Sequence, residues 1–136
     1  MNDLILKDML KARGLRATAS RILLLNLFNT DHIALMHSEI RSHLRNKVDR
    51  VSVYRIVAVL VAHNILIGFV DNGGNELFIL NRYKEVAEEI VPLVKCENCQ
   101  RVPQLPSLPF EYEMILKQNK LSKQPIFHGL CTSCQV

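Results

Sequence analysis

Four cysteines restrict the fold of this chain more than any other feature of its sequence. They form two pairs, Cys96 with Cys99 and Cys131 with Cys134, and 31 residues separate the pairs. A Cys-x-x-Cys turn directs two thiolates at one point, and two such turns complete the tetrahedral sulfur shell that zinc prefers. A shell of four thiolates is closed to water and substrate. We therefore expect one structural zinc ion per chain and no hydrolytic chemistry at the metal.

Two other uses of the cysteines fit the pattern less well. Disulfides are disfavoured in the cytosol, and a thioredoxin-like redox pair is disfavoured because neither Cys-x-x-Cys lies in a β–α–β pattern. Zinc would also answer an energetic need, since residues 83–136 make a unit of only 54 residues. A structural zinc ion supplies on the order of 10 kcal/mol of apparent folding free energy, more than so small a core provides.

The rest of the composition is typical of a soluble globular protein. The chain has 136 residues, of which 49% are hydrophobic and 22% charged. The longest apolar runs fall far short of the roughly 20 residues of a membrane span, and we see no signal peptide, so we expect a cytoplasmic protein without membrane contact. Residues 1–63 carry ten Lys and Arg against five Asp and Glu, whereas residues 64–136 carry seven against eight. A basic module of this kind favours nucleic acid as a partner.

The basic half has the pattern of helices followed by a hairpin. Apolar spacing predicts helices over residues 3–13, 18–29, 37–46 and 50–63, and we expect Thr18, Ser38 and Asp49 to cap the last three. Two short apolar strands then surround Asn-Gly-Gly, which is a strong hairpin signal. Helices followed by such a hairpin describe a winged helix-turn-helix, in which the last helix enters the major groove and the hairpin contacts the DNA backbone.

The helix that begins at Arg50 has two distinct faces. One face carries the apolar residues that should pack in a core, namely Val53, Ile56, Val57, Leu60 and Val61. The other face offers Ser52, Arg55 and small alanines, which would allow close approach to base edges, with Tyr54 at its border. We expect phosphate contacts at Arg16, Arg21 and Arg50, and also at Lys47. The alternative is a core helix whose Arg and Tyr side chains merely extend to solvent.

The second half should be a small α/β unit. We place the domain boundary after the hairpin, giving domains 1–82 and 83–136. The predicted elements of the second domain are a linking helix or turn over 83–90, strands over 91–96 and 100–104, a helix over 110–121 and a strand over 124–130. In the helix, we expect Tyr112, Ile115 and Leu116 to face inward.

Several motifs in order give the chain a resemblance to a known family. They are Leu15-Arg16-x-Thr18-x-x-Arg21, His37-Ser38-Glu39-Ile40, Asp49-Arg50-Val51-Ser52-Val53-Tyr54-Arg55, the hairpin, and the cysteine pairs with Gly129-Leu130 before the second. Nearly end to end, the chain resembles the ferric uptake regulator (Fur) superfamily of bacterial metal-responsive repressors. The resemblance implies an α+β fold, with an N-terminal winged helix-turn-helix and a C-terminal α/β dimerisation domain.

The resemblance also implies a function and its residues. It implies a homodimeric transcriptional regulator, not an enzyme, that binds a palindromic operator in double-stranded DNA. Zinc would be held by Cys96, Cys99, Cys131 and Cys134. The DNA-binding positions carried over are Arg16, Thr18, Arg21, Arg50, Ser52, Tyr54 and Arg55, with Tyr54 and Arg55 reading the groove.

The chain departs from the family at the sensory metal site. Family sensors usually carry a His-rich run before the first Cys pair, but here residues 89–93 are Glu-Ile-Val-Pro-Leu. Leu80 stands where zinc-sensing relatives often place a Cys, and Lys123 stands near another sensor His. Val, Leu and Pro offer no donor atoms, so we expect a degenerate regulatory site and apolar packing of Val91, Pro92 and Leu93 at the domain junction.

Two alternatives for the signal stay open. Metal regulation could use other ligands, drawn from His32, His37, His43, His63 and His128 with Asp31 or Glu76. The cysteines could instead form a thiol-based peroxide sensor that releases zinc on oxidation. An enzyme finds little support, because the sequence has no Gly-rich phosphate loop and no nucleophile elbow.

Overall fold

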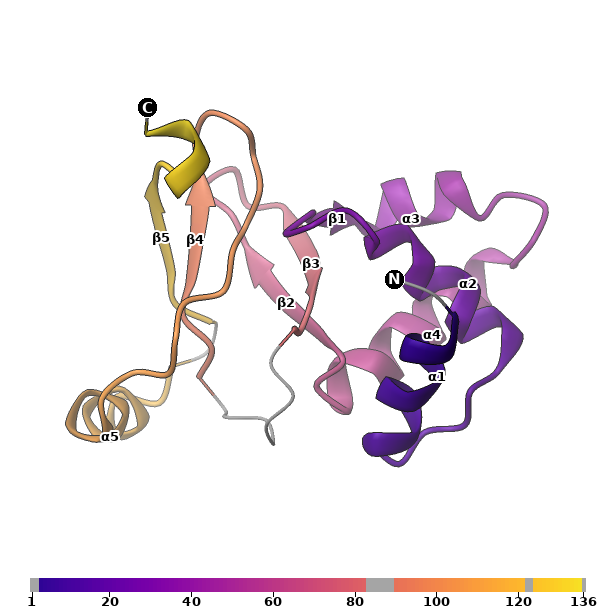
Figure 1. Cartoon of the computed structure of the whole chain (residues 1–136), viewed down its shortest axis with the longest axis horizontal. Helices are drawn as coiled ribbons and strands as arrows, with labels where there is room; N and C mark the ends of the chain where they lie inside the picture. Colours follow the sequence, from indigo (N-terminus) through magenta and orange to yellow (C-terminus); the bar gives the residue numbers. More distant parts are fainter. Residues whose placement is uncertain (1–2, 83–89, 122–123, 136) are drawn as a thin grey trace.

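The computed structural model describes residues 3–82, 90–121 and 124–135. Figure 1 shows a helical first half joined through a β-hairpin to a smaller second half. The first half contains α1 (Asp3–Ala12), α2 (Ala19–Leu25), the 3-10 turn η1 (Asn26–Phe28), β1 (Leu35–Met36), α3 (His37–His43), α4 (Arg50–Ala62), β2 (Leu66–Val70) and β3 (Glu76–Leu80). The second half contains β4 (Leu93–Cys96), α5 (Phe110–Gln118), β5 (Ile126–Gly129) and the 3-10 turn η2 (Thr132–Cys134).

Side-chain caps fix the starts of α2 and α4 as predicted. The Thr18 hydroxyl accepts the backbone N–H of Arg21 at 3.3 Å, and the Asp49 carboxylate accepts that of Ser52 at 3.1 Å. Each bond satisfies an N–H group that has no acceptor within its own helix. The recognition-helix candidate α4 therefore begins at a defined residue, Arg50.

The start of α3 differs from the prediction. The helix begins at His37, and the Glu39 carboxylate accepts the backbone N–H of Met36 at 3.0 Å. The predicted cap at Ser38 is wrong, because Ser38 already lies within the first turn of the helix. The helix also ends at His43, three residues earlier than expected, and Asn46 adopts a left-handed conformation with φ of 68° in the turn that follows.

The hairpin forms as predicted and gains a third strand. β2 and β3 pair antiparallel, and the Asp71 carboxylate accepts the backbone N–H groups of Gly73 and Asn75 at 2.9 Å to close the turn. Gly74 supplies the positive φ of 79° that the turn requires. β1 pairs with the other edge of β3, giving the order β1-β3-β2. Periodicity did not predict β1, which has only two residues.

One hydrophobic core joins the four helices of the first half to the hairpin. The predicted inward face of α4 is confirmed, since Val53, Val57 and Leu60 are at most 2% exposed. The core also contains Leu6, Leu10, Ile22, Leu24, Leu25, Phe28, Leu35, Ile40, Leu44, Ile65, Leu66, Phe78 and Leu80. These buried contacts hold α4 firmly while its opposite face stays exposed.

The second half has less regular structure than expected. β4 and β5 pair in parallel, as Figure 1 shows. The segment predicted as a strand over 100–104 runs beside β4, where Val94 N–H donates to Pro103 and Cys96 N–H donates to Arg101. It makes one isolated bridge, between Leu93 and Gln104, and forms no regular strand. Pro103 has no N–H to continue a ladder. The linking element predicted over 83–90 lies outside the described residues except for Ile90.

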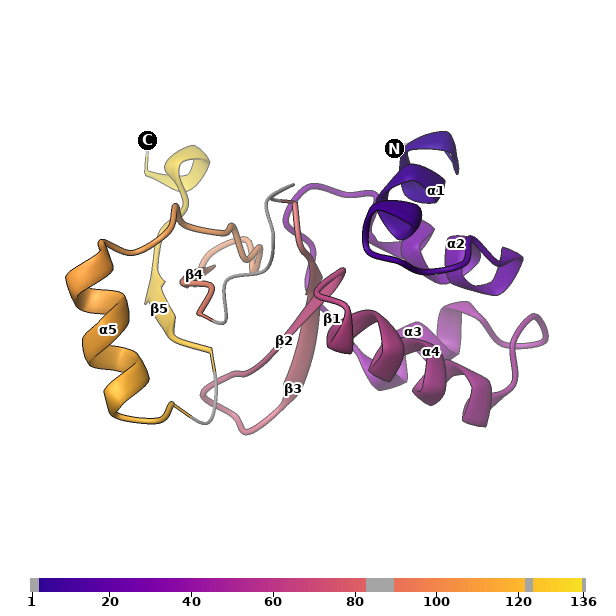
Figure 2. The same cartoon turned by 90° about the horizontal axis from the view of Figure 1, so that it is seen from below.

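Helix α5 lies beside β5 on the side away from the hairpin (Figure 2). The expectation that Tyr112 and Ile115 face inward is wrong for the protomer, because these side chains are 63% and 52% exposed. No residue of α5 is buried, and Leu116 is half-buried. This helix therefore carries an apolar face with little cover from its own chain.

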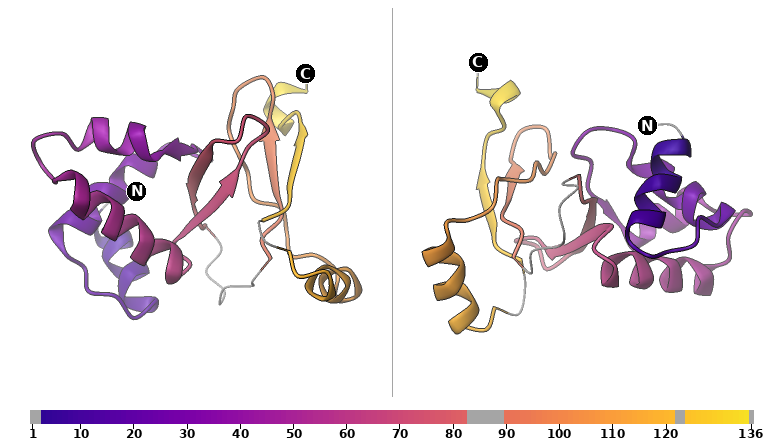
Figure 3. Two further views of the ribbon diagram at one scale, coloured as in Figure 1. Left: turned by 180° about the vertical axis from the view of Figure 1, so that it is seen from behind. Right: turned by 60° about the horizontal axis from the view of Figure 1, so that its bottom comes forward.

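A second apolar cluster joins the hairpin to the second half. In the views of Figure 3, the hairpin stands between the helices and the β4–β5 sheet. Ile67, Phe69 and Ile79 of the hairpin pack with Leu93 and Val102, and Leu93 is fully buried. Val91 packs against this cluster, so the predicted packing at the junction is confirmed for Val91 and Leu93. No helix within the described residues has the length and apolarity needed to cross a bilayer.

Candidate metal centre and nucleic-acid interface

The two cysteine pairs meet at one end of the β4–β5 sheet. β4 ends at Cys96, and β5 ends at Gly129, shortly before Cys131 and the turn η2 that contains Cys134, so the parallel pairing brings both cysteine pairs together. The four Sγ atoms all lie within 4.8 Å of one another, and those of Cys99 and Cys131 are 3.8 Å apart. A zinc ion with Zn–S bonds of about 2.3 Å requires sulfurs separated by about 3.8 Å. All four cysteines are free, and the residues fit a tetrahedral zinc site.

Hydrogen bonds shift the pKa values of two of these thiols. Backbone N–H groups of Cys131 and Cys99 donate to Cys96 and lower the pKa of its thiol to about 6. The Asn98 amide donates to Cys134 at 3.3 Å and lowers the pKa of that thiol, but the neighbouring thiols outweigh it and raise the pKa to about 11. The hydrogen bonds thus favour the thiolate form at Cys96, whereas the neighbouring thiols favour the protonated form at Cys134. Zinc binding would displace the remaining protons and strengthen as pH rises.

The outward face of α4 presents polar and small residues, as the sequence predicted. Arg50, Tyr54 and Arg55 are exposed on its first two turns. Ser52 lies between them and donates its hydroxyl to Asp49. Beyond them the exposed surface of the helix is formed by the small side chains of Ala58 and Ala62. Because these side chains are small, such a face can come close to the base edges in a DNA groove.

The other candidate residues lie on a separate element. Arg16 is exposed in the loop before α2, Thr18 caps α2, and Arg21 is in its first turn. Arg21 Nη1 donates to the Arg16 carbonyl at 2.9 Å, so these two residues share one local structure. The structure brings Arg50, Ser52, Tyr54 and Arg55 together on α4. The DNA-contact roles of these four residues, and those of Arg16, Thr18 and Arg21, stay predictions.

Tyr54 has neighbours that the sequence analysis did not identify. The His37 ring lies 4.5 Å from the Tyr54 ring and 4.8 Å from the Phe78 ring, between centroids. The Arg41 guanidinium lies over the Tyr54 ring, 5.7 Å from its centroid. His37 and Arg41 are four residues apart in α3, a spacing that placed them on one face, but only the packing of α3 on α4 brings Tyr54 to them.

The surroundings of His37 favour its neutral form. Burial lowers the pKa of its imidazole, an effect that Glu76 opposes and Arg41 reinforces. Its Nδ1 atom is buried and has no hydrogen-bond partner among the described residues. Tyr54 is therefore packed against a ring that also contacts Phe78 of the hairpin.

Comparison with solved structures places this arrangement in a known fold. The holo form of XcZur superposes with a TM-score of 0.75 at 22% identity over 98% of both chains. A zinc uptake regulator complexed with zinc and DNA gives 0.73 at 18% identity, over 97% of this chain and 91% of that one. The Vibrio cholerae ferric uptake regulator gives 0.56 at 19% identity, over 92% and 98%. No family model and no curated protein matches the sequence.

This chain has the fold of the Zur and Fur regulators. The superpositions extend over nearly the whole length, so they include the helical half, the hairpin and the half with the four cysteines. Their identities are low, and the agreement is therefore one of architecture. The TM-scores with the two Zur structures exceed the score with the Vibrio cholerae regulator, so the overall superposition is better with those Zur structures.

In this Zur/Fur fold, direct polar contacts between residues join the two halves. Val102 N–H donates to the His32 carbonyl at 2.8 Å, and the Lys95 ammonium lies 3.4 Å from the Asp71 carboxylate. The Gln104 side chain accepts Arg82 N–H at 2.7 Å and donates to Asn81 at 3.0 Å. These bonds supplement the apolar cluster of Leu93 and fix the hairpin against β4.

The histidines do not assemble a second metal site of three or more ligands. Among residues 3–82, 90–121 and 124–135, the four cysteines are the one group of at least three His, Cys, Asp or Glu side chains close enough to share an ion. His63 contacts the Val59 carbonyl at 3.0 Å, as expected at a helix end. Leu80, at the position where the family resemblance led us to look for a sensor Cys, is buried in the core.

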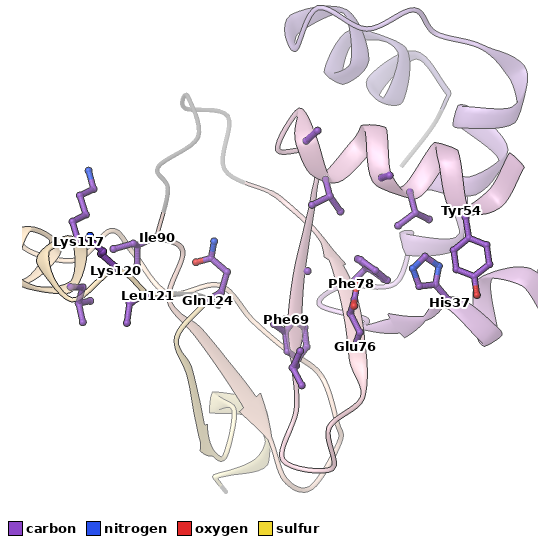
Figure 4. Close-up of a pocket in the computed structure, with 17 residues that line it drawn as sticks. His37, Tyr54, Phe69, Glu76, Phe78, Ile90, Lys117, Lys120, Leu121 and Gln124 are labelled. Atoms are coloured by element: carbon purple, nitrogen blue, oxygen red, sulfur yellow. The ribbon is translucent and has the colours of Figure 1, made fainter. Parts of the chain in front are cut away.

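A cleft of about 1030 Å³ separates α5 from α4 and the hairpin. Figure 4 shows Lys117, Lys120 and Leu121 on one side and His37, Tyr54 and Glu76 on the other. Between them, Phe69 and Gln124 line the cleft. Most of its lining on α4 is aliphatic, including Val57, Ala58 and Val61, so these positions provide no metal ligands.

Proposed function

We propose that this chain is a homodimeric, sequence-specific DNA-binding transcriptional regulator of Fur type, with one structural zinc ion per chain. The observation that carries the proposal is the whole-length likeness to a regulator solved with zinc and DNA. The polar outward face of α4 agrees with it. In this proposal α4 enters the major groove, and Tyr54 and Arg55 contact base edges. Cys96, Cys99, Cys131 and Cys134 hold the zinc.

Homodimer formation is supported by the uncovered apolar surface of the second half. Phe110, Tyr112, Ile115 and Phe127 are all more than half exposed in the protomer. Among the described strands, β5 pairs with β4 alone, so its other edge is available for a partner strand. A two-fold dimer would cover this surface and present two α4 helices to a palindromic operator.

The junction contacts support a regulator that does not depend on a sensory metal. In a metal-dependent regulator, the ion must favour the DNA-competent arrangement by binding it more tightly than other arrangements. Here Leu93, Val102 and the Lys95–Asp71 ion pair already hold the hairpin against the second half. We propose that these contacts set the domain arrangement, so that the zinc-loaded dimer binds DNA without an added ion.

Selection of duplexes from a random pool by the zinc-loaded protein tests the DNA-binding function. The expected result is a palindromic consensus, together with one zinc per chain by elemental analysis. Replacing Arg55 with Ala should cost about 1–3 kcal/mol of discrimination at one base position if it reads a base, and should lower affinity evenly across sequences if it contacts phosphate. Failure to enrich any sequence would contradict the function, and more than one tightly bound metal per chain would favour regulation through unusual ligands.

A thiol-based sensor is a second candidate, favoured by the exposure of Cys99. This sulfur lies at the surface, 3.8 Å from Cys131, so oxidation to a disulfide would require a small movement and would expel zinc. The expected signature is loss of two or more thiols and of zinc at low peroxide concentrations. Unchanged zinc content at high peroxide would remove this candidate.

A further inference from the structure

A second, smaller cleft lies between α3 and the start of α4, and its lining is strongly basic. It has a volume of about 430 Å³. Three arginines line it, Arg41 from α3, Arg45 from the turn that follows and Arg50 from the first turn of α4. Ser38 and Ser42 add hydroxyl groups from α3. We refer to this site as the basic cleft.

The charge of the basic cleft is only partly balanced. Asp49 also lines it, but this carboxylate is engaged by the hydroxyl and the backbone N–H of Ser52, which lower its pKa and keep it ionised. Three guanidinium groups against one carboxylate leave a surplus of two positive charges. Arg45 and Arg50 are exposed and make no ion pair with the described residues.

Arg41 lies between the basic cleft and the outward face of α4 that we propose contacts DNA. Its guanidinium lies over the Tyr54 ring, 5.7 Å from the centroid, so the cleft opens beside the exposed first turns of α4. Its Nε atom is buried and has no hydrogen-bond acceptor among the described residues. A buried guanidinium N–H without an acceptor is costly, and the same side chain lines the cleft, where an anion would accept from its guanidinium group.

We propose that the basic cleft binds one phosphodiester group of the DNA backbone, with Arg41, Arg45 and Arg50 as its ligands. Guanidinium groups donate paired N–H bonds to phosphate oxygens, and the helix preceding a recognition helix crosses the DNA backbone in helix-turn-helix proteins. The site adds Arg41 and Arg45 to the contacts expected from the sequence and places a phosphate next to Tyr54. It rests on the DNA-binding function proposed above.

The salt dependence of DNA affinity tests the proposal with the full zinc-loaded chain and the duplex that the wild type selects. The variants are Arg41→Gln, Arg45→Gln and the double variant, and Arg101→Gln in the second half is the control, because its side chain is exposed and far along the chain from α4. Loss of one phosphate contact should make the slope of log K against log salt shallower by about 0.9. We expect this change for the double variant, with affinity roughly 10-fold lower and the same base preferences.

Single neutral methylphosphonates in the duplex locate the contact. In the wild type, one such replacement beside the groove should weaken binding, and in the double variant the same replacement should cost nothing further. Arg45→Gln isolates the phosphate contact, since Arg45 has no recorded contact with Tyr54, and thermal melting checks that each variant folds. The proposal would be overturned if the double variant kept the salt slope of the wild type. It would also be overturned if every methylphosphonate weakened binding as much in the double variant as in the wild type. Neither result would contradict DNA binding itself. A wild type that selects no duplex would overturn both.

Discussion

The two halves of the chain differ sharply in how they bury apolar side chains. The first half encloses Leu6, Leu24, Leu25 and Phe28 completely, and four helices share that core with the hairpin. In the second half, α5 has no buried residue, and the fully buried Leu93 packs mainly against the hairpin of the first half. The first half can be stabilised by its own core, whereas the second has little core of its own and, in the function proposed above, would draw on zinc, the junction and a partner protomer.

Removal of zinc should show the difference between the two halves most clearly. Chelation, or replacement of Cys96 by Ser, should disorder the second half, because a structural zinc ion contributes on the order of 10 kcal/mol to so small a unit. Circular dichroism should still show the helical signal of the first half, and sedimentation should show that the dimer dissociates. A chain that stays fully folded and dimeric after complete chelation would contradict the metal centre.

Core truncation should affect the two halves unequally. Leu60→Ala removes a fully buried side chain and should lower the free energy of unfolding by about 2–5 kcal/mol. Ile115→Ala on α5 should change protomer stability by less than about 0.5 kcal/mol, because this side chain is 52% exposed, but it should weaken dimerisation. Urea unfolding at two protein concentrations separates these effects. Equal protomer destabilisation by both changes would refute the contrast.

The sequence predicted the first half better than the second for a physical reason. In the first half, apolar periodicity, Thr18 and Asp49 are local signals, and they correctly located α2, α4 and the hairpin. In the second half, the side chains of α5 face a surface that its own chain does not cover, so periodicity gave the wrong orientation for Tyr112 and Ile115.

The candidate site was likewise predictable only where its chemistry is local. The Cys-x-x-Cys spacing predicted that the four cysteines would meet, because each pair forms within one turn, and their sulfurs do lie together. The contacts of His37 and Arg41 with Tyr54 depend on how α3 packs against α4, and no short sequence pattern records that packing.

Helix capping offers a smaller test within the first half. Thr18→Ala removes the acceptor for Arg21 N–H and should lower the free energy of unfolding by about 1 kcal/mol. Ser38→Ala is the matched control, because Ser38 lies within α3 and does not cap it, so a change within about 0.5 kcal/mol is expected. Thermal melting compares the two variants. A larger loss at Ser38 than at Thr18 would contradict the observed start of α3.

The smallest expected effect is a pH dependence from His37. Burial lowers the pKa of His37 below its ordinary 6.5, so the unfolded chain binds its proton at higher pH than the folded chain. This residue should therefore make stability fall as pH drops through 6.5, until the folded imidazole is also protonated. His37→Phe keeps an aromatic ring and should flatten the profile, which urea unfolding between pH 7 and pH 5 can measure. Parallel profiles for the two proteins would exclude this role.

The central claim is that junction contacts, rather than a sensory metal, hold the DNA-competent arrangement. The most direct measurement is the affinity of the zinc-loaded dimer for its selected duplex, titrated with added zinc, iron and manganese salts. We predict an affinity that stays constant as each metal is added, because Leu93 and the Lys95–Asp71 pair already join the halves. A large gain in affinity with any of these metals would contradict the claim.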